Sequence, residues 1–145
     1  MTTLPIQLLL VEDSEPDILL IQEALQTTAI QFQLQVARDG IEALAFLRQQ
    51  PPFHMSVTPD MILMDINMPR KNGLDVLQEI KSDPLLRVIP VVMLTTSQAQ
   101  EDVVRAYEWQ ASSYIVKPVG FDPFMQAIQA LEQYWGDTVR FPPRV

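Results

Sequence analysis

The sequence contains no cysteine, only four glycines, and ten basic residues against eighteen acidic ones in a chain of 145 residues. The lack of cysteine excludes disulfide frameworks, thiolate catalysis and cysteine-based metal sites. The glycines, at positions 40, 73, 120 and 136, form no glycine-rich phosphate loop, which disfavours a flavin- or nucleotide-binding module. The net charge of −8 argues against nucleic acid as the main partner, because phosphate backbones are bound by lysine and arginine.

Long apolar runs are missing as well. The runs at residues 8–11 and 61–64 are far shorter than the ~20 residues of a membrane-spanning helix. The first basic residue is Arg38, so neither a signal peptide nor an arginine-rich transit peptide is predicted. We therefore expect a cytoplasmic protein with no membrane partner.

Apolar strand-like runs alternate with amphipathic helical stretches along the chain. Strands are predicted at residues 6–11, 32–36, 61–64, 90–94 and 113–116, each followed by a helical pattern. Nearly continuous apolar strands are typical of parallel strands that are buried on both faces. The pattern therefore predicts an α/β fold with an open, doubly wound, five-stranded parallel sheet. Residues 1–135 are expected to form one domain and residues 136–145 a tail.

Finer details of the helices are also predicted. In the second helix, Ile41, Leu44 and Leu47 are expected on one face. Ser97 is the expected cap of the fourth helix. The fifth helix carries an apolar stripe, most of it expected in the core, that consists of Phe121, Phe124, Ile128, Leu131 and Trp135.

Polar residues follow four of the five predicted strands. Glu12 and Asp13 follow the first strand, Asp65 the third, Thr95 the fourth and Lys117 the fifth. Ligands of such sheets bind at the carboxyl ends of the strands, so these groups are expected to converge. Carboxylates that lie close together repel one another, so either the pKa of at least one of them rises or a cation binds. Oxygen ligands that leave coordination positions for water suit Mg²⁺. A carboxylate in this setting can accept a phosphoryl group as an aspartyl phosphate.

The same residues resemble the response-regulator receiver domain of two-component signalling. The resemblance is carried, in order and spacing, by Glu12-Asp13, Asp65-Ile66-Asn67-Met68-Pro69 with Gly73, Thr95-Thr96, and Lys117-Pro118. Each motif alone is weak, but the four together span nearly the whole chain and are specific. The resemblance implies the flavodoxin-like receiver fold with strand order 2-1-3-4-5.

The resemblance also implies a phosphoacceptor switch rather than an enzyme that acts on metabolites. Asp65 would receive the phosphoryl group from a histidine kinase, assisted by Lys117. Mg²⁺ would be bound by Asp13, Asp65 and the backbone carbonyl of Asn67, while Glu12 would act through bound water.

Further implied features concern the switch and the surface. Thr95 would assist at the phosphoryl group and would form the switch pair with Tyr114. A cis peptide bond would precede Pro118. We expect the surface of the fourth helix, fifth strand and fifth helix to pair with a second copy or another protein. The aromatic interface candidates are Tyr107, Trp109, Tyr134 and Trp135.

A narrower similarity is to the cyanobacterial phytochrome-linked response regulators. It is carried by the long loop after the second helix, the run at residues 92–97, and a final helix that runs through Tyr134-Trp135 into a short tail. These relatives are free-standing receivers without an output domain that form homodimers. The similarity implies a phytochrome-type histidine kinase and a homodimer, with no output domain in this chain.

Other interpretations stay open at this stage. The chain could be a receiver that serves as a scaffold without phosphorylation. It could also be a phosphatase that uses an aspartyl phosphate, although enzymes of the haloacid-dehalogenase type place an Asp-x-Asp motif after the first strand, where this chain has Glu12-Asp13. The single histidine, His54, is expected to be a solvated loop residue.

Overall fold

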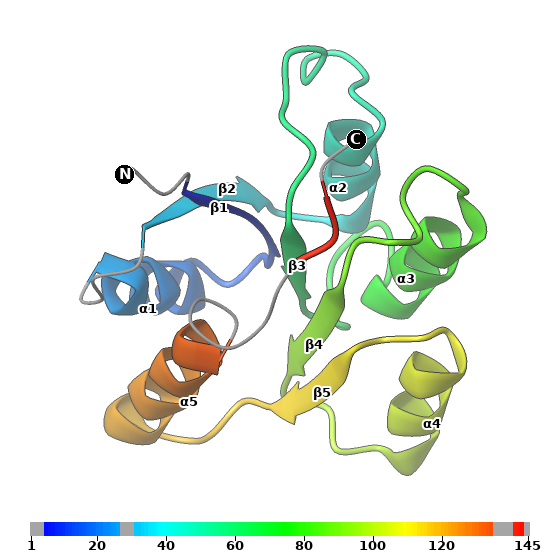
Figure 1. The fold of residues 1–145 in the computed structure, drawn as a ribbon. Helices are drawn as coiled ribbons and strands as arrows, with labels where there is room; N and C mark the ends of the chain where they lie inside the picture. The colour runs from blue at the N-terminus through cyan, green and yellow to red at the C-terminus, as the bar shows by residue number, and fades with distance from the viewer. Residues whose placement is uncertain (1–4, 27–30, 135–140, 144–145) are drawn as a thin grey trace.

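Five parallel strands form one sheet in the order β2-β1-β3-β4-β5 (Figure 1). The computed structural model describes residues 5–26, 31–134 and 141–143. The strands are β1 (Ile6–Val11), β2 (Phe32–Ala37), β3 (Met61–Met64), β4 (Val91–Thr95) and β5 (Ser113–Val116). The predicted fold class and strand order are confirmed, and the strand bounds differ from the predicted ones by one residue at most.

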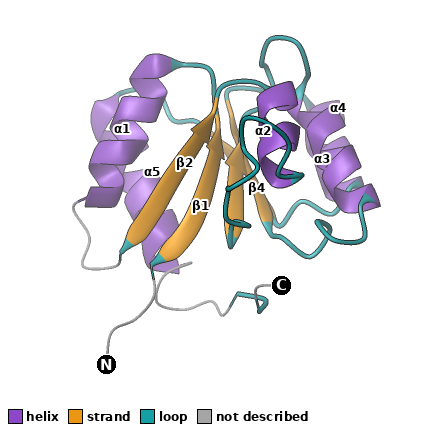
Figure 2. Ribbon diagram, turned by 90° about the horizontal axis from the view of Figure 1, so that it is seen from above, coloured by secondary structure: helices purple, strands orange, loops and turns teal. Residues whose placement is uncertain are grey.

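The helices divide between the two faces of the sheet (Figure 2). They are α1 (Glu15–Gln26), α2 (Gly40–Leu47), α3 (Gly73–Ser82), α4 (Gln100–Glu108) and α5 (Phe121–Gln133). One face is covered by α1 and α5, which pack against each other, and the other by α2, α3 and α4. Among the described residues, no helix is both long enough and apolar enough to cross a bilayer.

The central strands are apolar throughout because both of their faces are covered. In β1, Leu9 and Val11 join the core under α2, α3 and α4, whereas Leu8 and Leu10 join the core under α1 and α5. The same alternation runs through β3 and β4, as expected for side chains that point to opposite faces in turn. This doubly buried sheet holds the ends of β1, β3 and β4 in a fixed relation to one another.

Side chains cap the start of two helices. The carboxylate of Asp39 accepts a hydrogen bond of 2.8 Å from the backbone N–H of Glu42, at the start of α2. The side chain of Asn72 accepts one of 2.7 Å from Leu74 at the start of α3. Such bonds satisfy backbone donors that the first turn leaves unpaired.

The predicted cap of α4 is wrong. The residue at the cap position is Ala99, which has no side-chain acceptor. Ser97 lies two residues earlier, where its hydroxyl accepts a bond of 3.3 Å from Ala99 N–H and donates one of 2.6 Å to Asp102 Oδ2. Ser97 therefore stabilises the loop before α4 through these hydrogen bonds and does not cap the helix.

Two residues of the predicted apolar stripes lie at the surface. Ile41 is exposed because the buried face of α2 repeats at Gly40, Ala43, Leu44 and Leu47, which leaves Ile41 beside it. Phe121 is exposed because it is the first residue of α5, one turn before the first buried position of that helix, Phe124.

The other stripe members of α5 follow the prediction in part. Ile128 is buried with Phe124, Leu131 is half-buried against the same core, and Trp135 lies outside the described residues.

The prediction of a cis peptide bond before Pro118 is wrong. The cis bond of the described residues is Pro51–Pro52, and the bond before Pro118 has the trans form that X–Pro bonds usually prefer.

Candidate functional site

Three carboxylates meet at the carboxyl ends of β1 and β3. Glu12 and Asp13 follow β1, Asp65 follows β3, and one oxygen from each lies within 4.8 Å of the others. The two strands are adjacent and parallel, with Val11 level with Met64, so the residues after them emerge side by side. Glu12 and Asp65 are buried, whereas Asp13 is exposed to solvent. The predicted convergence of these three residues is thus present.

The ammonium group of Lys117 lies among these carboxylates. Its Nζ is 2.6 Å from Glu12 Oε2, 2.8 Å from Asp17 Oδ2 and 3.5 Å from Asp65 Oδ2. The backbone N–H of Lys117 donates to the carbonyl of Thr95 at 2.8 Å, which anchors the lysine at the end of the sheet. Lys117 is therefore a buried cation shared by three acidic groups.

The close charges alter the acid–base properties of the site. Burial raises the pKa of Glu12 above its ordinary value, and the charge of Asp65 adds to this, although the hydrogen bond from Lys117 acts in the opposite direction. Burial would lower the pKa of Lys117, but hydrogen bonds to Asp17 and Glu12 outweigh it and raise the pKa instead. The lysine thus remains charged at neutral pH.

The donor set fits a hard divalent cation. Carboxylate oxygens are ligands that Mg²⁺ binds in proteins, and Mg²⁺ keeps several waters, which suits the exposed position of Asp13. The cluster of Glu12, Asp13 and Asp65 therefore has the ligand type and the access that such an ion needs. Asn67 is exposed in the loop after β3. Binding of the ion by its backbone carbonyl stays a prediction.

The backbone of Asp65 is held by the loop that follows it. One carboxylate oxygen, Oδ1, accepts a hydrogen bond of 2.7 Å from the N–H of Ile66, while Oδ2 faces Lys117. Gly73 N–H donates to the carbonyl of Ile66 at 2.8 Å. A Cβ atom at Gly73 would lie 2.0 Å from the carbonyl oxygen of Asp65, so only glycine fits there.

The two predicted switch residues are both bonded to Ser97. Thr95 is fully buried, and its hydroxyl oxygen accepts a bond of 3.3 Å from Ser97 N–H. The hydroxyl of Tyr114 donates to the Ser97 carbonyl at 3.0 Å, and burial raises the pKa of Tyr114 above its ordinary value. Since Ser97 also binds Asp102, this one residue links Thr95, Tyr114 and the first turn of α4.

The interface candidates occupy different environments. Tyr107 on α4 and Tyr134 after α5 are exposed. Trp109 is half-buried and packs against the core under α2, α3 and α4, so it covers a core edge. Trp135 lies outside the described residues. His54, the single histidine, is exposed in the loop between α2 and β3 as predicted.

Asp17 is the acidic neighbour of Lys117 that sequence reasoning missed. Asp17 lies in the first turn of α1, where its N–H donates to Ser14 Oγ at 3.4 Å. Its carboxylate also binds Lys117, far away in the sequence. The available signal was its place in the first turn of the helix that follows the acidic pair at the strand end.

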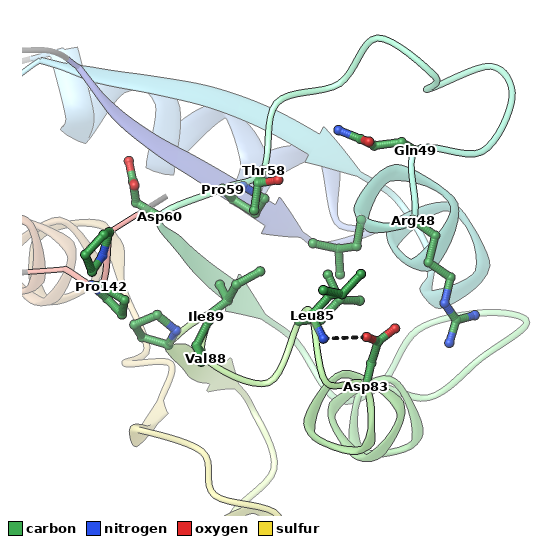
Figure 3. Close-up of a pocket in the computed structure, with 14 residues that line it drawn as sticks. Arg48, Gln49, Thr58, Pro59, Asp60, Asp83, Leu85, Val88, Ile89 and Pro142 are labelled. Carbon is green, nitrogen blue, oxygen red and sulfur yellow. Dashed lines mark hydrogen bonds between the residues drawn. The ribbon is translucent and has the colours of Figure 1, made fainter. Parts of the chain in front are cut away.

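A separate cavity lies at the other end of the sheet (Figure 3). It has a volume of about 360 Å³ and is lined by the end of α2, the loops before β3 and β4, and Pro142 and Pro143. Its wall residues Asp60 and Pro90 directly precede β3 and β4, whereas the acidic cluster follows β1 and β3. The cavity is therefore not part of the carboxylate site.

Comparison with known proteins agrees with this geometry. Residues 8–129 match the family model of the response regulator receiver domain. The chain is 44% identical over 138 residues to response regulator Rcp1 of Synechocystis sp.. The aligned region covers 95% of this chain and 94% of that protein.

Two solved structures are also similar over almost the entire chain. The Mn²⁺-bound form of response regulator Rcp1 has a TM-score of 0.93 at 43% identity, and covers 96% of this chain and 100% of that one. The phosphorylated cyanobacterial phytochrome response regulator RcpA has a TM-score of 0.94 at 40% identity, and covers 97% of this chain and 100% of that one.

Proposed function

This chain belongs to the response regulator receiver domain family, and on that basis we propose that Asp65 is its phosphoacceptor. The single observation that carries the proposal is the position of Asp65, buried beside two further carboxylates with Oδ2 3.5 Å from Lys117. A histidine kinase is the proposed donor. The P–N bond of its phosphohistidine breaks as a P–O bond to Asp65 forms, and the freed imidazole nitrogen takes the electron pair.

The surrounding residues have proposed roles in this transfer. Asp13, Asp65 and the Asn67 carbonyl would hold Mg²⁺, with Glu12 acting through water. When bound, the ion neutralises oxygens of the phosphoryl group, which is the main need of phosphoryl transfer. Lys117 offers a second positive charge within reach of Asp65.

The proposed kinase partner is of the phytochrome type. Support comes from the similarity to Rcp1 and to RcpA, which is described as a phosphorylated cyanobacterial phytochrome response regulator. In this proposal the chain acts as a signal carrier, not as an enzyme on metabolites.

The proposed output is a change at the surface of α4, β5 and α5. Phosphorylation replaces the single charge of the Asp65 carboxylate by a group of about −1.5 to −2, a net gain of about −0.5 to −1 charge units. Thr95 would turn its hydroxyl from Ser97 N–H toward the phosphoryl group, which loosens the loop that Ser97 holds. Tyr114, bonded to the same Ser97, would follow. A shift between two such arrangements is how a local charge changes a distant surface.

Intact-mass spectrometry tests the phosphoacceptor proposal. The wild type, incubated with acetyl phosphate and Mg²⁺, is expected to gain one phosphoryl group, and Asp65→Asn is expected to gain none. Asp122→Asn, a matched change at an exposed site on α5, should behave as the wild type. A gain in Asp65→Asn would show that Asp65 is not the acceptor. No gain in a folded wild type with Mg²⁺ would favour the scaffold alternative.

We also propose that the surface of α4, β5 and α5 pairs with a second copy. Val104, Tyr107 and Val116 are large apolar side chains that are exposed there. Aromatic residues are frequent anchors of interfaces, so Tyr107→Ala is expected to weaken the homodimer about tenfold or more. Analytical ultracentrifugation with and without phosphodonor measures this. Leu19→Ala, an exposed change on α1, is the control, and an equal monomer–dimer equilibrium in all three proteins would contradict the proposal.

A further inference from the structure

The carboxylate of Asp17 is an unassigned partner of the site lysine. It comes from the first turn of α1 rather than from a strand end, and the bond between Ser14 Oγ and Asp17 N–H helps to fix that turn. Asp17 Oδ2 is 2.8 Å from Lys117 Nζ, whereas Asp65 Oδ2 is 3.5 Å away. Lys117 therefore makes its two short contacts with Glu12 and Asp17, and its longest contact with Asp65.

We propose that Asp17 is a positioning residue that competes with the phosphoryl group for Lys117. Asp17 thereby lowers the affinity of the pocket for a phosphoryl group at Asp65. The inference rests on the proposed function of Asp65. A lysine ammonium has three donors, and Glu12 and Asp17 already take two of them at short distance. The third donor is on the side of Asp65, 3.5 Å away, so a phosphoryl group there must share an ammonium whose position and charge are already partly taken up by Asp17.

The charge balance acts in the same direction. Four carboxylates, those of Glu12, Asp13, Asp17 and Asp65, surround or adjoin one lysine. A phosphoryl group carries about −1.5 to −2 charge units in place of the single charge of the Asp65 carboxylate, so the pocket gains about −0.5 to −1, and like charges at this range repel. The cluster that could bind a metal ion consists of Glu12, Asp13 and Asp65. Asp17 is outside this cluster and adds a further negative charge. Removal of its charge should therefore favour the phosphorylated pocket while those three carboxylates stay in place.

The binding of beryllofluoride measures this effect at equilibrium. The beryllium of BeF₃⁻ exchanges a water ligand for an oxygen of Asp65, which places three fluorines where the phosphoryl oxygens would lie. At saturating Mg²⁺, Asp17→Asn is expected to bind beryllofluoride about three- to tenfold more tightly than the wild type, the scale of one partly exposed ion pair. Calorimetry gives the affinity, and ¹⁹F NMR reports the bound anion.

The chain offers a matched control and a rescue. Glu15→Gln removes the same charge from the same helical turn, but Glu15 pairs with Arg38 at the surface and not with Lys117. Its affinity is expected to stay within about twofold of the wild type, since exposed charges are strongly screened. Asp17→Glu restores the carboxylate and should return the affinity toward the wild-type value. A purely structural role for Asp17 would instead weaken binding in Asp17→Asn.

The outcomes separate this inference from the proposed function. If the wild type binds beryllofluoride and Asp65→Asn does not, the phosphoacceptor proposal holds, and equal affinities of Asp17→Asn and Glu15→Gln would then overturn the role of Asp17 alone. Weaker binding by Asp17→Asn would overturn it as well. If the folded wild type fails to bind with Mg²⁺ present, the proposed function itself fails, and the inference with it.

Discussion

Replacement of Lys117 by alanine is expected to lower the free energy of unfolding by about 3–5 kcal/mol at neutral pH. Lys117 is the cation beside a buried Glu12, at 2.6 Å, and it also neutralises Asp17 and Asp65. Without the ammonium, the buried Glu12 must either carry an unpaired charge or take up a proton, and both cost free energy at neutral pH. The penalty of a buried charge without a partner is larger than the net value of the pair that was lost.

The decrease in the free energy of unfolding caused by Lys117→Ala is expected to depend on pH. Burial already raises the pKa of Glu12 in the folded wild type, and removal of the lysine raises it further. A carboxyl with a raised folded pKa contributes its stability below the unfolded pKa and loses it as the pH rises through the folded pKa. The difference between wild type and variant should therefore be widest at neutral pH and shrink as the pH falls toward the ordinary pKa of Glu12.

Denaturant unfolding with EDTA present, at several pH values, measures both effects. Lys71→Ala is the matched control, because Lys71 pairs with Glu79 in a half-exposed position and its loss should cost about 1 kcal/mol or less. A Lys117→Ala variant no less stable than Lys71→Ala would contradict the electrostatic account of the pocket. A difference that stays constant with pH would contradict the part assigned to Glu12.

Substitution of Gly73 by alanine is expected to destabilise the protein by about 3 kcal/mol, the upper range for overpacked sites. The new Cβ would lie 2.0 Å from the carbonyl oxygen and 2.9 Å from the carbonyl carbon of Asp65. These are backbone atoms, which cannot rotate away as a side chain can. Alanine is a better helix former than glycine by about 1 kcal/mol, but this gain is too small to offset the clash.

Gly120→Ala provides the comparison for the change at Gly73. Gly120 has a φ of +102°, but its added Cβ would meet Pro123 only at 3.6 Å, so it tests the backbone cost without a clash. Its expected loss is about 1–3 kcal/mol, because a φ of +102° with a ψ of 155° is a conformation that almost only glycine adopts. Thermal and denaturant unfolding compare the two variants. A Gly73→Ala protein as stable as the wild type would mean that the loop after β3 does not press on Asp65 as described.

The fold and the acidic cluster were predictable because they follow from local pattern. Strands such as β1 and β3 are apolar on both faces, and parallel strands bring their following residues to one edge. The grouping of Glu12, Asp13, Asp65 and Lys117 needs only strand ends and chain direction. It did not require knowledge of any side-chain packing.

The parts that sequence reasoning missed depend on tertiary contacts. Asp17 meets Lys117 only because α1 packs back over the end of β1, and its local role near Ser14 concealed that contact. Ser97 resembles a helix cap in the sequence, yet it is the shared partner of Thr95, Tyr114 and Asp102. Periodicity alone could not decide how far each apolar stripe stays covered, as Ile41 shows.

Chemical trapping of the phosphoryl group tests the central claim most directly. Borohydride reduces an acyl phosphate of aspartate to homoserine and releases phosphate, so the phosphorylated residue is marked covalently. After incubation with phosphodonor and Mg²⁺, reduction and peptide mass spectrometry, we predict homoserine at position 65 and nowhere else. Homoserine at Asp13 or Asp17, or its absence from a protein whose intact mass had risen, would contradict the assignment of Asp65 as the phosphoacceptor.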